Sequence, residues 1–375
     1  MRTLQIYSGN LYGGVERTIT TIATTPGHFQ REFALCFDGR LRTELRALGV
    51  QVHDLGRVRG RRPWTVARAR RALRTVLERR AFDVAICHSA WSQAIFGPIV
   101  RRAGLPLVFW LHDVATGRHW LERWARLTRP DLVICNSRFT ARSVASLYPN
   151  VRTEIVRPPV VTGPDGLVAG RADVRRTVGA GDDVVVIVQV ARLESLKGHD
   201  AHLEALALLK DVAPPWQCWM VGGAQRPHEA RYLQALRRKA TALGIADRVK
   251  FLGQRSDVPA LLSAADIYCQ PNVRPDAFGI AFVEALAAGL PVVTTALGGA
   301  LEIVDETCGS LVPPARREAL ASALRRLIVD PGLRATLGSA GPARARRLCD
   351  ANRQMDWLDS VLGSMAPAPA VEALA

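Results

Sequence analysis

Lysine is missing from the first 160 residues of the chain, where arginine alone carries the positive charge. These residues hold 26 Arg against 11 Asp and Glu, a balance of +15. Residues 161–375 hold 24 Lys and Arg against 23 acids, a balance of +1. Almost all of the formal net charge of +16 therefore lies in the first half. This asymmetry predicts that the first half faces an anionic partner.

Long apolar runs are also missing. No apolar stretch reaches the roughly 18 residues of a membrane-spanning helix, and residues 1–7 have the pattern of a strand, without the apolar core of a signal peptide. We expect a cytoplasmic protein that could attach peripherally to the inner face of the cell membrane. With 375 residues, 48% of them hydrophobic and 22% charged, the chain can form two globular domains.

Two sequence patterns that would point to other chemistry are absent. The seven cysteines are odd in number, contain no C-x-x-C pair and mostly lie in apolar runs, so we expect buried reduced thiols rather than disulfides, metal ligands or nucleophiles. The loop 8–17 contains Gly13 and Gly14 but no G-x-G-x-x-G fingerprint, which argues against a dinucleotide-dependent dehydrogenase. Glycine at such a position still lets backbone amides approach phosphate or sugar oxygens.

Strand patterns alternate with helical patterns through both halves, which predicts an α/β fold with parallel sheets. The expected strands are 1–7, 33–37, 84–87, 107–110, 132–135, 184–190, 217–221, 249–252, 267–270 and 291–295. Proline and glycine crowd together at 157–166, where strand patterning stops. We expect two doubly wound, Rossmann-like domains, 1–160 and 161–345. Residues 346–375 should form a helix that could return to the first domain, followed by a frayed tail.

A basic helix is the main charge feature of the first half. The segment from Arg57 to Arg80 carries ten arginines and one acid, and apolar residues at helical spacing from Thr65 onward. This pattern suits an anionic membrane surface, although a solvated basic helix remains the alternative. The patch 118–126 mixes tryptophan with arginine, which favours an interfacial role. No recognition helix or single-strand-binding signature accompanies the charge, so we expect no nucleic-acid partner.

The most informative segment places Asp276 and Glu284 eight positions apart around the start of a helix expected over 278–288. At about 1.5 Å per residue the two carboxylates could hold opposite ends of a ligand roughly 12 Å long. Between them lie the backbone amides of Gly279 and Ile280, at a helix terminus that stabilises phosphate. A nucleotide diphosphate-sugar has this layout. The alternative is an N-capping Asp276 with Glu284 on a solvent face.

Two further features support a ligand site. Arg192 and Lys197 follow a strand at 184–190, where cations can neutralise a diphosphate leaving group. His112 ends the apolar strand 107–110 and could hydrogen bond to a sugar hydroxyl, although a lone histidine there is more often structural.

Together these residues resemble the retaining glycosyltransferases of the group-one class, family four, which have the GT-B fold of two Rossmann-like domains facing each other over a nucleotide-sugar cleft. The resemblance covers roughly 180–315 strongly and is carried by Arg192-Leu193, Lys197-Gly198, Asp276-Ala277-Phe278-Gly279, Glu284-Ala285, Gly289-Leu290-Pro291-Val292-Val293 and Gly298-Gly299-Ala300-Leu301-Glu302-Ile303-Val304. Gly13-Gly14-Val15-Glu16 and His112 match more weakly. Two positions depart from the family pattern: Asp276 replaces glutamate, and Ala191 replaces the glycine before the arginine.

The resemblance implies a role for each matching residue. Arg192 and Lys197 would clasp the diphosphate, and Glu284 would hold the ribose hydroxyls. Asp276 would bind hydroxyls of the donor sugar.

The remaining matches complete the implied site. The amides of Gly279 and Ile280 would face the distal phosphate and sugar. Gly14, in the loop with Gly13, would contact phosphate, and His112 would lie near the reacting carbon. Glu302 would support the surrounding helix and loop.

The expected function is a retaining, metal-independent glycosyltransferase that moves a hexose-type sugar from a UDP- or GDP-sugar to an acceptor hydroxyl. The cleft loops contain no Asp-x-Asp metal motif, so no metal or other cofactor is expected. The acceptor would be a lipid-linked or cell-surface glycan precursor. A GT-B-fold sugar-nucleotide epimerase or phosphorylase is the alternative, and a basic nucleic-acid-binding protein is a more distant one.

Overall fold

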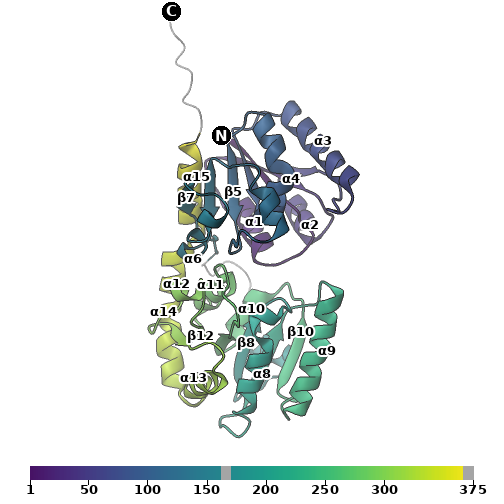
Figure 1. Cartoon of the computed structure of the whole chain (residues 1–375). Helices are drawn as coiled ribbons and strands as arrows, with labels where there is room; N and C mark the ends of the chain where they lie inside the picture. The colour runs from purple at the N-terminus through teal and green to yellow at the C-terminus, as the bar shows by residue number, and fades with distance from the viewer. Residues whose placement is uncertain (162–169, 366–375) are drawn as a thin grey trace, which may run out of the picture. The chain divides into compact units, whose positions relative to one another are not determined.

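The computed structural model describes residues 1–161 and 170–365, which divide into two compact units (Figure 1). Unit 1 comprises Met1–Pro159 and the chain from Ala351 onward, and unit 2 comprises Val160–Asp350. Part of the expected linker, 162–166, and the expected frayed tail, 366–375, lie outside the described residues. Within the described part, none of the helices has both the length and the apolar character needed to cross a membrane.

Unit 1 is built on a parallel sheet. Its strands among the described residues are β1 (Arg2–Tyr7), β2 (Gln30–Leu35), β3 (Val52–Asp54), β4 (Val84–His88), β5 (Leu107–Leu111), β6 (Leu132–Cys135) and β7 (Arg152–Ile155). They are ordered β3-β2-β1-β4-β5-β6-β7, and every neighbouring pair is parallel. The order reverses between β1 and β4, the point where doubly wound sheets open a crevice for ligands.

Helices cover both faces of this sheet. They are α1 (Gly14–Thr24), α2 (Arg40–Ala47), α3 (Pro63–Arg79), α4 (Ser89–Arg102), α5 (Trp120–Ala125), α6 (Arg138–Ala141) and α15 (Ala351–Gly363). Successive residues of β4 alternate between two cores, as the two-residue period of a strand requires. Ala85 and Cys87 pack with residues of α3 and α4, whereas Val84 and Ile86 pack with residues of α15.

The last described helix, α15, belongs to unit 1 although it follows unit 2 in the chain. In Figure 1 it is the yellow helix beside β7. Asp359 pairs with Arg31 at 3.1 Å and accepts a hydrogen bond from the backbone amide of His28. The indole of Trp357 donates to the carbonyl of Ile155 in β7. These contacts join α15 to β2, β7 and the loop before β2.

Unit 2 repeats the plan with a second parallel sheet. Its strands in the described part are β8 (Val185–Val190), β9 (Trp216–Val221), β10 (Val249–Gly253), β11 (Ile267–Gln270), β12 (Val292–Thr295) and β13 (Gly309–Val312). Their order is β10-β9-β8-β11-β12-β13, and the direction of winding reverses between β8 and β11. The predicted α/β class with two doubly wound sheets is thereby confirmed.

Two hydrophobic cores flank the sheet of unit 2. Its helices are α7 (Arg171–Val178), α8 (His199–Ala207), α9 (Pro227–Ala242), α10 (Val258–Ala264), α11 (Ile280–Ala287), α12 (Ala300–Ile303), α13 (Arg317–Val329) and α14 (Pro331–Cys349). Residues of α7, α10, α11 and α12 pack on one face, residues of α8, α9 and α13 pack on the other, and α14 contributes to both cores. All seven cysteines of the chain are buried and none forms a disulfide, as expected.

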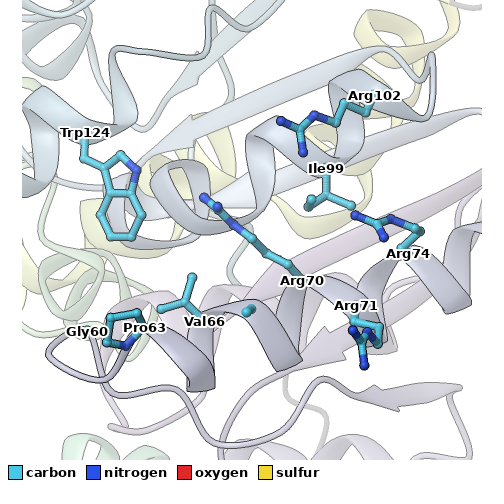
Figure 2. Close-up of a pocket in the computed structure, with 10 residues that line it drawn as sticks. Gly60, Pro63, Val66, Arg70, Arg71, Arg74, Ile99, Arg102 and Trp124 are labelled. Carbon is cyan, nitrogen blue, oxygen red and sulfur yellow. The ribbon is translucent and has the colours of Figure 1, made fainter.

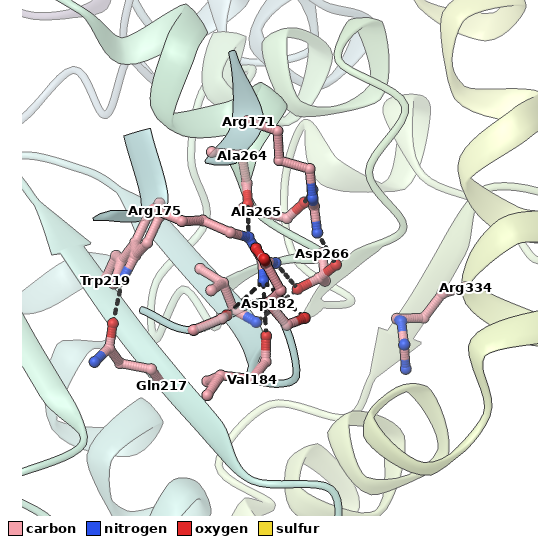
Figure 3. A network of polar contacts seen from close by, with 12 residues as sticks. Arg171, Arg175, Asp182, Val184, Gln217, Trp219, Ala264, Ala265, Asp266 and Arg334 are labelled. Atoms are coloured by element: carbon pink, nitrogen blue, oxygen red, sulfur yellow. Dashed lines mark hydrogen bonds and ion pairs between the residues drawn. The ribbon is translucent and has the colours of Figure 1, made fainter. Parts of the chain in front are cut away.

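A buried ion pair holds the amino-terminal edge of this sheet (Figure 3). Asp266, just before β11, accepts from Arg175 at 2.5 Å and from the amide of Val186 in β8 at 2.7 Å. Arg175 is 1% exposed, and it also donates to the carbonyls of Ala264 and Val184. Because each guanidinium nitrogen has a partner, the charge is stable in the interior. The network fixes β8 and β11, the strands whose opposite ends carry the predicted site.

Candidate active site

Several of the predicted ligand-binding residues of unit 2 lie on the loops that follow β8 and β11. These strands are neighbours in the sheet and flank its switch point. Arg192 and Lys197 follow β8, and Asp276 and Gly279 follow β11. Chain segments after parallel strands emerge at the same edge, so residues 79 positions apart come together there.

The β8 loop is held in shape by buried polar side chains. Gln189, which is fully buried in β8, donates from its amide nitrogen to the carbonyl of Lys197 at 2.9 Å. Its carbonyl oxygen accepts from Nδ1 of His202 at 2.8 Å, which places the proton of that ring on Nδ1. Burial lowers the pKa of His202 to about 3, so the ring is neutral at physiological pH. Lys197 is therefore positioned by two residues that the sequence did not suggest.

Gly198 allows the two loops to touch. Its φ is +73°, and a Cβ atom built there would lie 1.7 Å from the carbonyl oxygen of Pro271. The amide of Val273 donates to the carbonyl of Leu196 at 2.9 Å. Only glycine fits this approach, which explains the Lys197-Gly198 pair in physical terms.

The loops are also joined through their charges. Nζ of Lys197 lies 2.5 Å from Oδ2 of Asp276, and both side chains are largely buried. Arg192 pairs with Glu194 within its own loop at 3.0 Å. The structure thus brings Lys197 and Asp276 together and leaves the guanidinium of Arg192 about one third exposed.

Glycine also sets the start of α11. Gly279 caps this helix with a φ of +104°, so α11 begins at Ile280, two residues later than predicted. Glu284 lies one turn after Ile280 and is half-buried. The preceding loop is fixed because the amide of Gly299 donates to the carbonyl of Asp276 at 2.9 Å. Asp276 and Glu284 therefore flank the amino terminus of α11, as the sequence predicts.

Glu302 lies on the short helix α12, which begins directly after Gly299. The carbonyls of Glu302 and Ile303 accept hydrogen bonds from Arg344 of α14, and Arg344 also pairs with Asp305. This anchoring of α12 is compatible with the supporting role that the resemblance implies.

In unit 1, Gly13 and Gly14 lie at the start of α1, after β1. The carboxylate of Glu16 accepts from the amide of Gly13 at 2.8 Å and from the hydroxyl of Tyr7 at 2.7 Å. Glu16 is 3% exposed. The amide of Gly13 is therefore used to cap α1, whereas Gly14 lies at the surface on the first turn.

His112 lies in a buried chain of hydrogen bonds at the carboxyl edge of the same sheet. Nε2 of His88 lies 2.7 Å from Oε1 of Gln5, and Nδ1 of His88 lies 2.9 Å from Nε2 of His112. Nδ1 of His112 lies 3.3 Å from Nδ2 of Asn136, whose carbonyl oxygen accepts from the indole of Trp110. Residues of β1, β4 and β5 and the residue after β6 thus form one continuous network.

The network defines the tautomers of both histidines. Because the carbonyl oxygen of Gln5 can only accept, Nε2 of His88 carries its proton and Nδ1 accepts from Nε2–H of His112. Nδ1 of His112 then accepts from Asn136. Burial lowers the pKa of His88 to about 3, and burial together with the neighbouring His88 lowers the pKa of His112 well below its usual value. Both rings are neutral at physiological pH, and both nitrogens of His112 have partners within the chain.

Sequence reasoning missed His88. The expected strand 84–87 ended one residue before it, and nothing local links it to Gln5, which lies 83 positions away. A polar residue within the last two positions of an otherwise apolar strand is the pattern that could have identified His88 and Gln189.

No group of three or more His, Cys, Asp or Glu side chains among the described residues is arranged to hold a metal ion. Metal independence nevertheless stays a prediction that only an assay can test.

Two α/β units, each built on a doubly wound parallel sheet with polar loops at its switch point, have the architecture of the GT-B fold. The chain belongs to family four of the group 1 glycosyltransferases. The model for glycosyl transferases group 1 matches residues 171–344, and the model for glycosyltransferase family 4 matches residues 12–163.

Relatives with assigned names support this membership. The GDP-mannose-dependent alpha-(1-6)-phosphatidylinositol monomannoside mannosyltransferase of Mycolicibacterium smegmatis is 32% identical over 66% of this chain and 68% of that protein. The D-inositol 3-phosphate glycosyltransferase of Kribbella flavida is 29% identical over 75% of this chain and 71% of that protein. Both are glycosyltransferases, and the chain is an enzyme of this class.

Solved structures agree on the fold. Anabaena Alr3699/HepE in complex with UDP-glucose superposes with a TM-score of 0.84 at 25% identity, over 97% of this chain and all of that chain. WaaG, a glycosyltransferase involved in lipopolysaccharide biosynthesis, superposes with a TM-score of 0.69 at 22% identity, over 96% of this chain and 99% of that chain. The predicted GT-B fold is confirmed.

Proposed function

We propose that the chain is a retaining, metal-independent hexosyltransferase that uses a UDP- or GDP-linked sugar and transfers it to an acceptor hydroxyl. One observation carries this proposal: the cationic loop after β8 and the carboxylate-bearing loop after β11 meet at the switch point of unit 2, through Lys197 and Asp276. A nucleotide diphosphate-sugar needs cations, helix amides and carboxylates in such proximity.

The donor is divided among the residues of unit 2. Arg192 and Lys197 bind the diphosphate, and the amides of Gly279 and Ile280 face its distal phosphate. Asp276 accepts hydrogen bonds from hydroxyls of the donor sugar. Glu284 accepts hydrogen bonds from the hydroxyls of the ribose. The shorter side chain of Asp276 keeps the acceptor chemistry of the usual glutamate and changes its reach.

Transfer exchanges one bond at the anomeric carbon for another and moves one proton. The acceptor oxygen bonds to the anomeric carbon, the bond from that carbon to the phosphate oxygen breaks, and the leaving phosphate takes the acceptor proton on the same face of the sugar. Arg192 and Lys197 stabilise the negative charge that develops on the leaving diphosphate, which is the role a metal ion plays elsewhere. The acceptor oxygen approaches the same face of the sugar from which the phosphate departs, so the configuration at the anomeric carbon is retained.

Unit 1 contributes Gly14 toward phosphate and His112 toward the sugar near the reacting carbon. The structure adds a reason for the neutrality of His112. Positive charge develops on the sugar carbon in glycosyl transfer, and a protonated imidazole there would oppose it. The network through His88 and Asn136 keeps the ring uncharged and fixed in orientation.

The acceptor is proposed to be a lipid-linked or cell-surface glycan precursor at the cytoplasmic face of the membrane. The balance of +15 over residues 1–160 supports an anionic acceptor or surface. The names of the two relatives each include a phosphorylated inositol, as phosphatidylinositol monomannoside in one and D-inositol 3-phosphate in the other. Attachment to the membrane through the segment from Arg57 to Arg80 is part of the proposal.

A thermal-shift screen with UDP, GDP, ADP and their common sugar conjugates identifies the nucleotide of the donor. Wild type is compared with Lys197→Ala and Glu284→Ala. One nucleotide family should raise Tm in the wild type and in neither variant. The absence of any shift with all nucleotides would contradict the proposal.

Product analysis separates the transferase from its alternatives. Incubation of the preferred donor with an acceptor glycolipid, with and without EDTA, should give an acceptor-dependent product of unchanged anomeric configuration. Epimerised donor would point to an epimerase, and phosphate-dependent cleavage of a glycoside to a phosphorylase. Loss of activity with EDTA that added Mg²⁺ or Mn²⁺ restores would overturn metal independence.

A further inference from the structure

A basic groove lies on unit 1, on the surface shared by α3, α4 and α5 (Figure 2). Its volume is about 530 Å³. Arg70, Arg71 and Arg74 reach it from α3, and Arg102 reaches it from the end of α4. In Figure 2 the side chains of Arg70, Arg74 and Arg102 gather around Ile99, whereas Arg71 points away from them. Three guanidinium groups thus border one small hollow.

This groove concentrates positive charge on one surface of unit 1. Among the described residues, no carboxylate lies within ion-pair distance of Arg70, Arg74 or Arg102, although Arg80 of the same segment pairs with Glu32 and Arg101 pairs with Asp131. Like charges this close repel each other, and an anion between them would relieve that repulsion.

One of the arginines is held in place. Nε and Nη2 of Arg70 donate to the carbonyls of Ile95 and Ala94 in α4, at 2.7 and 3.3 Å. Its guanidinium lies 5.8 Å from the ring centroid of Trp124. Burial and the neighbouring Arg102 lower the pKa of Arg70. The groove therefore has a fixed cationic floor, and Arg74 and Arg102 are exposed at its edge.

Tryptophans surround the same groove. Trp124 lines it and stacks on Trp120, whose ring lies close to the lining residue Gly60. Trp120 is 60% exposed, and Trp64, which follows the lining residue Pro63, is 66% exposed. Tryptophan prefers the boundary between water and lipid, so these exposed rings beside a basic groove suit a membrane interface.

We propose that this groove binds the headgroup phosphate of an anionic phospholipid, while Trp64 and Trp120 enter the interfacial region of the bilayer. Phosphate is the shared chemistry of a lipid headgroup and a free anion, and guanidinium groups bind it through paired hydrogen bonds. The exposed tryptophans favour a lipid over a free anion, because only a lipid bilayer offers an apolar region that their rings can enter. The proposal narrows the expected contact from the whole segment between Arg57 and Arg80 to α3 residues near Arg74, and adds Arg102 from α4.

Vesicle co-sedimentation without donor or acceptor tests this site, so its result is independent of the catalytic proposal. One set of vesicles contains phosphatidylcholine alone. The other contains phosphatidylcholine with about 30 mol% phosphatidylglycerol, which supplies the anionic headgroups. The test variant is Arg74→Gln with Arg102→Gln. The matched control is Arg68→Gln with Arg79→Gln, which removes the same charge from exposed α3 positions outside the groove.

Wild type should bind only the anionic vesicles, and more strongly as salt falls. The test variant should bind about thirtyfold more weakly, whereas the control should stay within about threefold. All four substituted side chains are exposed, so the variants should keep the Tm of wild type. Equal losses in the two variants would show diffuse surface charge and overturn the groove as a specific site, as would unaltered binding of the test variant.

Two further measurements distinguish the sources of phosphate. Inorganic phosphate and soluble glycerophosphate should displace the protein from anionic vesicles only weakly. Trp120→Ala and Trp64→Ala should each lower vesicle affinity while leaving phosphate binding unchanged. If inorganic phosphate binds as tightly as the vesicles do and the tryptophan variants behave like wild type, the groove is a site for a free anion and the lipid proposal fails.

Discussion

Nζ of Lys197 and Oδ2 of Asp276 lie 2.5 Å apart and join the loops that follow two neighbouring strands of unit 2. The proposed function assigns Lys197 to the diphosphate and Asp276 to the sugar. The ion pair therefore connects the two halves of the proposed donor site. Substitution of either residue should change the position and charge environment of the other.

Lys197→Ala should weaken binding of the preferred nucleoside diphosphate about tenfold to a hundredfold, because a hydrogen bond to a charged group contributes roughly 1.5–3 kcal/mol. Asp276→Asn should keep the affinity for the nucleoside diphosphate within about threefold of the wild-type value. The variant should no longer bind the nucleotide-sugar more tightly than the nucleoside diphosphate. Isothermal titration with both ligands measures the two effects. The double variant should be non-additive, since the residues are in contact.

Equal loss of diphosphate affinity in both single variants would contradict this division of roles. Asp257→Asn is a suitable control, because its carboxylate pairs with Arg255 on another loop of the same unit.

His88→Leu should lower turnover about tenfold to a hundredfold without weakening nucleotide binding. The substitution removes the acceptor of Nε2–H of His112, and a misoriented group near the reacting atoms typically costs about that much. Steady-state kinetics and calorimetry separate the two quantities. His88→Gln, which retains a hydrogen-bonding side chain, should recover part of the turnover. A purely structural role for His88 would instead lower Tm and leave the turnover of the folded enzyme unchanged.

Acidification between pH 7.5 and 5.5 should destabilise the protein through its buried histidines. Burial lowers the pKa of His199 to about 4, and it lowers the pKa of His88 and His202 to about 3. Histidine in the unfolded chain has a pKa of about 6.5. Below that value the unfolded chain binds protons that the folded chain does not. Each group then costs about 1.4 kcal/mol per pH unit, until the pH reaches its folded pKa.

Urea unfolding at pH 7.5, 6.5 and 5.5 measures this dependence. His202→Gln should lower the number of protons taken up on unfolding by nearly one at pH 5.5, and the same change at the exposed His228 serves as control. A stability that does not vary over this range would rule out neutral buried histidines as the cause.

Asp266→Ala should cost unit 2 about 3–5 kcal/mol, because it leaves the buried guanidinium of Arg175 without its carboxylate. Asp173→Ala removes the partner of Arg176 in an exposed pair and should change the free energy of unfolding by less than about 0.5 kcal/mol. Urea denaturation compares the two. Similar effects of both substitutions would show that the buried network contributes little.

The central strands could be predicted from the sequence, and several edge strands could not. The expected ranges 132–135 and 267–270 coincide with β6 and β11, because both faces of a central parallel strand are buried and give continuous apolar runs. The short edge strands β3, β7 and β13 were missed. β7 has the sequence Arg-Thr-Glu-Ile, in which one exposed side leaves no such run.

The site followed a similar division. The positions of Asp276, Glu284, Arg192 and Lys197 near one edge of a sheet could be predicted, because strand ends and a helix start are local patterns. Their roles toward a ligand stay predictions. Hydrogen bonds between distant strands have no local pattern, so the contact between His88 and His112 could not be predicted.

The helix α15 makes unit 1 discontinuous in the chain. Leu358 and Val361 pack into the same core as Val84 and Ile86, although more than 260 residues separate them, and the whole of unit 2 lies between. During synthesis on the ribosome, unit 2 has all of its residues before unit 1 has its last helix. The nascent chain therefore carries an unfinished sheet face, with Val84 and Ile86 not yet covered by α15, until that helix has been synthesised.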